Sequence, residues 1–104
     1  MRIRPLEHTT FSPEKMAKVT LAEGAGMMVG LNCLLPGQEH RLHAHAGMDK
    51  VYHVLAGTGR FLLADGDRPM AAGDMLIAPA DMPHGVRNDG AENLVVLAIL
   101  APGP

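Results

Sequence analysis

Short apolar stretches, separated by Gly, Pro or charged residues, recur along the 104-residue chain. In several of them apolar and polar side chains alternate with a period of two, which is typical of half-buried β-strands. Each stretch is also too short for an ordinary helix. We therefore predict strands over residues 27–35, 41–46, 50–56, 59–64, 74–79, 84–88 and 93–100.

Two other segments carry different signals. Residues 64–69 contain an Asp-Gly pair and predict a tight hairpin turn between two strands. Residues 12–18 are the one helical candidate, because Ser12 could cap a helix and Pro13 suits the first helical position. Many short strands with almost no helix predict an all-β sandwich or small barrel, formed as a single domain over residues 1–104.

The composition fits a globular domain and limits the classes of partner. Hydrophobic residues make up 47% of the chain but aromatic residues only 3%, so the core must be largely aliphatic. The formal net charge is −2 and the basic residues are scattered, which argues against nucleic acid or a membrane surface as a partner. A small molecule is the expected ligand.

The compartment is inferred from what the sequence lacks. A single cysteine, Cys33, allows no intramolecular disulfide. The first residues have no apolar signal region, and the longest apolar run, 93–100, is too short to cross a bilayer. These features predict a cytoplasmic protein.

Four of the six histidines lie between residues 40 and 53. Because side chains at positions i and i+2 of a strand share a face, His43 and His45 could reach a common ion. The same parity places His40 and His53 off that face, whereas His84 could add an imidazole from a distant strand. Three neutral imidazoles are an adequate site for zinc or a similar ion. Alternating histidines also occur on exposed strands without metal, so the pair alone leaves both interpretations open.

The histidine pair lies within a longer motif. Gly37 is followed by five residues, the pair His43 and His45, four more residues, Lys50, six residues and Gly57. This spacing resembles the first motif of the cupin superfamily, in which the position of Lys50 is a glutamate. Only that position departs from the family pattern.

A second motif of the same family follows. Gly73 is followed by five residues and Pro79, then by Asp81, His84 and Asn88 at the spacing of the second cupin motif. The family has glycine where this chain has Asp81. The change is mild, because Asp tolerates the left-handed backbone conformation that glycine adopts in turns.

The resemblance extends over residues 37–88, half of the chain, with its motifs at 37–57 and 73–88, and it has structural and chemical implications. It implies a cupin barrel, which is a double-stranded β-helix of the jelly-roll type. It also implies a metal inside the barrel, bound by His43, His45 and His84, and association into a homodimer. The identity of the divalent ion, whether zinc, nickel, iron or manganese, stays open.

Lys50 complicates the metal site, because a protonated amine near a dication costs several kcal/mol. Burial and a neighbouring cation could remove its proton, so that Lys50 ligates the metal or acts as a general base. Alternatively, Lys50 could bind a substrate carboxylate. The site could also hold no metal, with Lys50 and the histidines performing acid–base chemistry directly. A fourth possibility is that Lys50 extends to the rim without a role.

Other side chains near this segment are weaker candidates. Tyr52 shares the face of Lys50 and could donate a proton, although such a tyrosine is often a packed wall residue. Arg41 could hold an anionic substrate or lie solvated at the mouth. Glu39 could be a fourth ligand or a partner of Lys50.

Three functions follow from these observations. The first is a metalloenzyme that acts on a small polar organic or sugar-acid substrate, as an isomerase, lyase or dioxygenase. The second is a metal-free epimerase or isomerase that uses Lys50 as an acid–base group. The third is a non-catalytic domain that binds a small ligand or a metal, since many unrelated functions share one fold.

Overall fold

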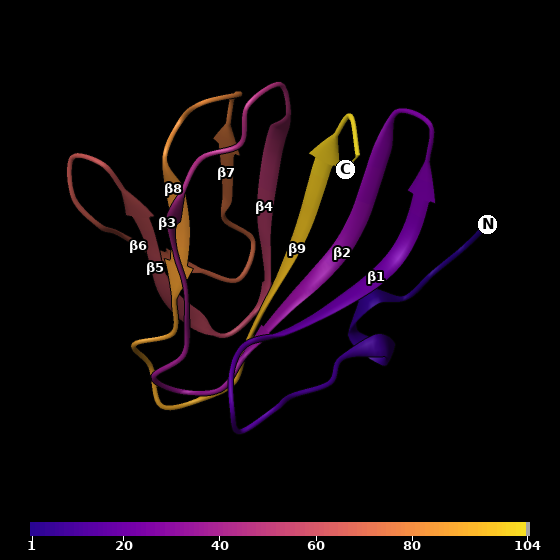
Figure 1. Cartoon of the computed structure of the whole chain (residues 1–104). Coiled ribbons are helices and arrows are strands. Elements are labelled where there is room, and N and C mark those ends of the chain that lie inside the picture. Colours follow the sequence, from indigo (N-terminus) through magenta and orange to yellow (C-terminus); the bar gives the residue numbers. More distant parts are fainter. Residues whose placement is uncertain (104) are drawn as a thin grey trace.

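The computed structural model describes residues 1–103 and shows a barrel of two facing antiparallel sheets (Figure 1). The described part of the chain contains a short 3-10 helix, η1, and nine strands. Their bounds are η1 Pro5–His8, β1 Ala17–Gly24, β2 Met27–Leu34, β3 Glu39–His43, β4 Asp49–Ala56, β5 Thr58–Leu63, β6 Arg68–Ala71, β7 Met75–Ala78, β8 His84–Arg87 and β9 Leu94–Ala101.

One sheet has five strands in the order β1-β2-β9-β4-β7, and the other has four in the order β3-β8-β5-β6. Strands distant in sequence are therefore neighbours, as in the pairing of β2 and β4 with β9. The predicted all-β fold, a double-stranded β-helix of the jelly-roll type, is confirmed. Within residues 1–103, no helix has the length and apolar character needed to cross a membrane.

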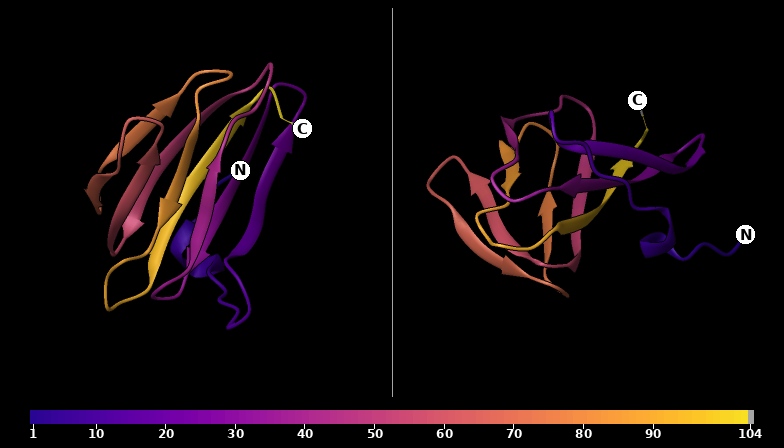
Figure 2. Two further views of the ribbon diagram at one scale, coloured as in Figure 1. Left: turned by 60° about the vertical axis from the view of Figure 1, so that its left-hand side comes forward. Right: turned by 90° about the horizontal axis from the view of Figure 1, so that it is seen from below.

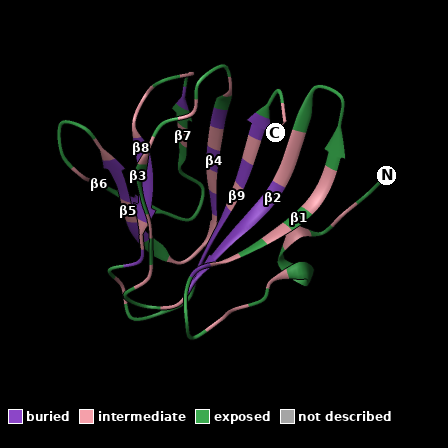
Figure 3. Cartoon of the chain, in the orientation of Figure 1, coloured by how far each residue is buried: buried purple, intermediate pink, exposed green. Residues whose placement is uncertain are grey.

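The main core fills the space between the sheets, and alternation along the strands supplies it. On β4, for example, Tyr52 and Val54 are fully buried, while Val51 and His53 on the other face are partly exposed. Phe61 and Val86 meet them from the four-stranded sheet. Figure 3 shows buried residues along β2, β4 and β9, the centre of the five-stranded sheet.

A smaller apolar cluster covers the outer face of the five-stranded sheet. Leu31, Cys33 and Val95 are buried there, and Phe11 from the N-terminal segment packs against them. Figure 2 shows this N-terminal segment on the side of the sheet away from the four-stranded sheet. Cys33 is thus a buried apolar residue, and its burial raises the thiol pKa.

The helix expected over residues 12–18 is wrong, because β1 begins at Ala17. Ser12 does accept a hydrogen bond from the main-chain N–H of Glu14, but it forms a local turn and not a helix cap. Met16 enters the main core, whereas Ala17 packs against the outer cluster. This alternation lets both faces of the segment bury apolar surface, and it overrides the capping signal.

Two strand boundaries also differ from expectation. The hairpin turn near residues 64–69 is present, but β6 begins inside that range at Arg68, where Phe61 is its partner on β5. The strand expected over residues 41–46 is β3, which begins at Glu39 and ends at His43. His45 therefore lies in the loop after the strand and not on the strand itself.

Candidate metal and ligand site

His43 and His84 are direct partners across two neighbouring strands, at the end of β3 and the start of β8. Nδ1 of His43 lies 2.6 Å from the main-chain oxygen of Arg41, and Nδ1 of His84 lies 2.8 Å from that of Met82. A carbonyl oxygen only accepts, so each Nδ1 must carry the proton and each Nε2 must present a lone pair. This arrangement is typical of metal-binding histidines.

The Nε2 atoms of His43 and His84 are buried and have no hydrogen-bond partner among the described residues. Buried polar atoms in folded proteins rarely lack a partner, so these two atoms require an explanation. His45 completes a group of three whose ligand nitrogens all lie within 4.8 Å of one another. The donor set therefore fits a divalent cation that accepts imidazole nitrogen.

The electrostatic environment keeps these imidazoles in the form that binds metal. Burial, together with the nearby His84 and Lys50, lowers the pKa of His43 to about 4, although the hydrogen bond to the main chain of Arg41 opposes this shift. Burial also lowers the pKa values of His45 and His84. All three rings are therefore neutral near pH 7.

Lys50 lies within the barrel beside this group and not at its rim. Only 4% of its surface is exposed, and its Nζ lies 4.6 Å from the centre of the Tyr52 ring. No carboxylate within residues 1–103 forms an ion pair with it. Burial, together with the charge of Lys18, lowers the Lys50 pKa to about 8. The amine therefore stays largely protonated at pH 7 when no metal is present.

Regular strand parity predicts that His40 points away from His43 and His45, but in the structure His40 lines the same cavity. The register between β3 and β8 shifts between His40 and His43, so the side-chain parity changes there. The two rings lie 4.2 Å apart, and burial lowers the pKa of His40 to about 3. No local feature of the sequence marks the bulge, so regular alternation was the wrong assumption.

Tyr52 is fully buried, with its hydroxyl 3.5 Å from Nδ1 of His40. Burial raises the pKa of this hydroxyl, so it stays protonated. The ring lies parallel to that of Phe61, with centroids 6.4 Å apart. Tyr52 therefore belongs to the core through its ring and borders the histidine group through its hydroxyl.

The other polar side chains of this region are exposed or bound elsewhere. Glu39 is exposed and accepts a hydrogen bond from Arg87 at 3.2 Å, so it is neither a fourth ligand nor a partner of Lys50. The Arg41 side chain is exposed. The Asp49 carboxylate accepts a hydrogen bond from the N–H of Ala80.

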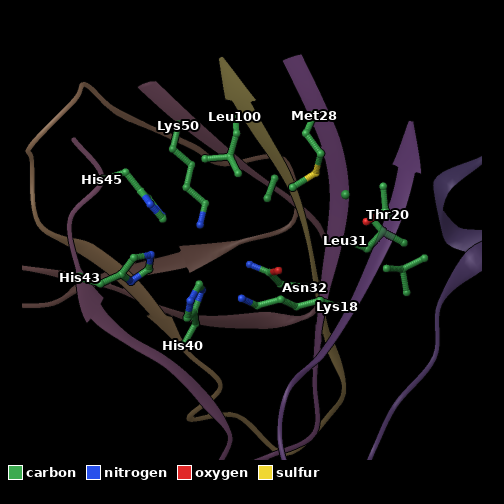
Figure 4. A pocket seen from close by; sticks show the side chains of 13 residues that line it. Lys18, Thr20, Met28, Leu31, Asn32, His40, His43, His45, Lys50 and Leu100 are labelled. Atoms are coloured by element: carbon green, nitrogen blue, oxygen red, sulfur yellow. The ribbon is translucent and has the colours of Figure 1, made fainter. Parts of the chain in front are cut away.

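A cavity of about 170 Å³ adjoins the histidine group (Figure 4). In Figure 4 the side chains of His40, His43, His45, Lys50, Asn32 and Lys18 converge on it. The wall on the side of β1 and β2 includes Thr20, Met28 and Leu31. Lys18 and Asn32 belong to no motif in the sequence, and only the pairing of β1 with β2 brings them to this cavity.

The fold and site define a class: a small β-barrel with a group of three histidines from the end of β3, the loop after it and the start of β8. Residues 30–100 match the family model of the Cupin domain, and the chain belongs to this family. The motif resemblance is thereby confirmed, including the left-handed conformation of Asp81, whose φ is 70°.

Known proteins with similar folds or sequences support this assignment. The solved structure of TT1209 from Thermus thermophilus is 39% identical with a TM-score of 0.92, and all of both chains is covered. An RmlC-like cupin from Desulfovibrio desulfuricans is 28% identical with a TM-score of 0.89, over 100% of this chain and 99% of that one. A gentisate 1,2-dioxygenase from Ralstonia is 32% identical over 73% of this chain, which spans 21% of that protein.

Proposed function

We propose that this cupin is a metalloenzyme in which His43, His45 and His84 bind one divalent cation and a small polar organic or sugar-acid substrate reaches the adjoining cavity. The observation that carries the proposal is the pair of buried Nε2 atoms without partners, each on a ring whose Nδ1 is held by a main-chain carbonyl. Such an arrangement directs two lone pairs to one place before any ion binds.

The bound ion would supply Lewis-acid chemistry to a carbonyl, carboxylate or enediol oxygen. The residues of the chain would do the rest. Lys50 is placed to donate hydrogen bonds to an anionic oxygen, and the Tyr52 hydroxyl, next to His40, is placed to hold a proton. The apolar side chains beneath them exclude water from that end of the barrel.

The reaction would be an isomerisation, an elimination or, with a redox-active metal, a dioxygenation. Similarity to part of a gentisate 1,2-dioxygenase supports dioxygenation as one of these three reactions. Zinc, nickel, iron and manganese all accept imidazole ligands, so the donor set alone does not select the ion.

A metal-free acid–base enzyme is the second candidate, and one observation favours it. The pKa of Lys50, lowered by burial to about 8, brings its amine closer to the range in which a general base works. In this version the histidines would position the substrate and Lys50 would exchange its proton.

Metal analysis separates the two candidates. Protein purified without an affinity tag should contain about one divalent ion per chain, measured by mass spectrometry of the elements. His84→Ala should weaken binding of the ion at least about tenfold, because it removes one of three ligands. His53→Ala is the matched control, since His53 lies on the outer face of β4. Metal retained by His84→Ala, or turnover that is unchanged in protein stripped of metal, would rule out the metalloenzyme.

A further inference from the structure

The cavity beside the histidines carries positive charge that no acidic group balances. Lys50 and Lys18 both line it, and neither forms an ion pair within residues 1–103. No Asp or Glu in the described chain lines the cavity, and the two acidic residues nearest to Lys50 in the sequence are engaged elsewhere, since Asp49 binds Ala80 and Glu39 binds Arg87. Two cations without a counter-ion form a site for an anion.

Asn32 provides an independent observation in the same cavity. Its side chain is on β2, only 5% of the residue is exposed, and its Nδ2 is a buried donor without a partner in the described part of the chain. Leaving such a donor unpaired is costly, and an acceptor from a ligand would remove that cost. The side chain lines the cavity with the lysines and points toward them (Figure 4).

Strand register explains why these residues converge. Lys18 on β1 is the direct partner of Asn32 on β2, so their side chains share the inner face of the five-stranded sheet. Lys50 on β4 is the partner of Leu100 on β9, which in turn pairs with Met28 on β2. Lys18 and Asn32 therefore reach the cavity from one side of β9, and Lys50 reaches it from the other.

We propose that Lys18, Asn32 and Lys50 form an anion-binding pocket that takes the carboxylate of a small organic acid and holds it next to the three histidines. The inference rests on the proposed function, because it assumes that the substrate binds beside the three histidines. It assigns the substrate class, which is a small organic acid. Lys50 and Asn32 bind the carboxylate oxygens inside the barrel. Lys18, whose side chain is exposed, attracts the anion at the mouth.

The cavity volume limits the size of the acid. About 170 Å³ is the volume that about six water molecules occupy in the liquid. An acid with about six to ten non-hydrogen atoms matches this space, whereas a nucleotide or an oligosaccharide does not. The pocket also favours an anion, because two of its three polar groups are cations and the unpartnered atom of the third, Nδ2 of Asn32, is a donor.

The test compares two probes of equal size that differ in charge, butyrate and butyramide. Each is titrated into the protein in a low-salt buffer without competing anions and is followed by nuclear magnetic resonance of the Asn32 side-chain amide. Butyrate should shift this resonance and bind at least about tenfold more tightly than butyramide, and added salt should weaken its binding. Equal binding of the two probes, or no binding of butyrate, would overturn the proposal.

Three variants locate the pocket. Lys18→Gln and Asn32→Leu should each weaken butyrate binding by about fivefold or more, whereas Lys15→Gln, which removes an exposed charge outside the cavity, should change it less than about twofold. Lys18 is exposed, so its variant should fold normally, and thermal melts check this for all three. Unchanged affinity in both Lys18→Gln and Asn32→Leu would overturn the assignment.

Running the titration on metal-loaded and on chelator-treated protein separates this inference from the proposed function. Butyrate binding that depends on Lys18 and Asn32 in both forms supports the pocket, even if metal analysis finds no ion and the metalloenzyme fails. If metal binding depends on His84 but butyrate binding does not depend on Lys18 or Asn32, the metalloenzyme is supported and the anion-binding pocket is overturned.

Discussion

The amine of Lys50 lies over the face of the Tyr52 ring, with Nζ 4.6 Å from the ring centre. Contacts of this type stabilise a cation by about 0.5 to 2 kcal/mol, depending on how far it is desolvated. The cupin motif has a glutamate at the position of Lys50, so here the contact with Tyr52 stabilises a charge of the opposite sign. Lys50 is thus the main difference between this chain and the family motif.

Lys50→Glu should strengthen binding of a divalent cation. The change removes a repelling charge and supplies the ligand that the family motif has at this position, so affinity should rise by about tenfold or more near neutral pH. Competition with a chromogenic chelator measures it. Lys15→Glu makes the same charge change on an exposed residue and serves as the control. Equal or weaker metal binding by Lys50→Glu would show that Lys50 does not face the ion.

The metal-free protein should lose stability in mild acid. Burial lowers the pKa of His40 to about 3 and of His43 to about 4, from the ordinary 6.5. Between these values the unfolded chain binds more protons than the folded one, so the free energy of unfolding decreases as pH falls from 6.5 toward 4. The slope cannot exceed about 1.4 kcal/mol per pH unit for each group, and partial exposure reduces it.

Urea denaturation at several pH values within this window measures the slope. His40→Leu should make it shallower, because one of the buried imidazoles can no longer take up a proton. His53→Leu, on the outer face of β4, should leave it unchanged. A slope that is the same in wild type and His40→Leu would contradict the assignment.

Two motif glycines should differ in their tolerance of alanine. Gly37 and Gly57 have similar left-handed backbones, with φ values of 88° and 87°, so alanine costs each about 1 to 2 kcal/mol of backbone strain. A Cβ at Gly37 would meet open space, whereas a Cβ at Gly57 would overlap the main-chain oxygen of Asn93. Gly57→Ala should therefore lose about 1 to 3 kcal/mol more of unfolding free energy. Equal losses would show that the contact with Asn93 relaxes without cost.

We also predict a homodimer formed through the outer face of β4 and β7. Met75 and Ile77 are each 56% exposed there, and Val51 lies beside Ile77 across the strand pair. A second copy would cover this apolar surface. Light scattering at micromolar concentration should give twice the mass of one chain, and Ile77→Asp should give monomers. Leu6→Asp, at a similarly exposed site on η1, should leave the dimer intact.

Local patterns were enough to predict much of the fold. Alternation over residues 50–56 correctly predicted that Lys50 and Tyr52 share one face of a strand, because a regular strand repeats every two residues; the structure shows that this is the buried face of β4. The spacing of the two motifs correctly indicated the barrel. It also selected His43, His45 and His84, which the fold brings together although His45 and His84 are 39 positions apart in the sequence.

The errors have a common cause in long-range pairing. Residues 17–24 carry a weak strand signal, and β1 forms because β2 offers it an edge and Phe11 helps to cover its outer side. His40 enters the cavity because of a bulge that depends on the register between β3 and β8.

The sequence by itself determined which side chains could coordinate a cation and which residues of β4 share a face, because both follow from local spacing and a period of two. Only the tertiary structure decided that Lys18, Asn32 and His40 share the cavity with Lys50. Their convergence depends on strand pairing across the sheets and on one bulge, and contacts of that kind leave no local trace in the order of the residues.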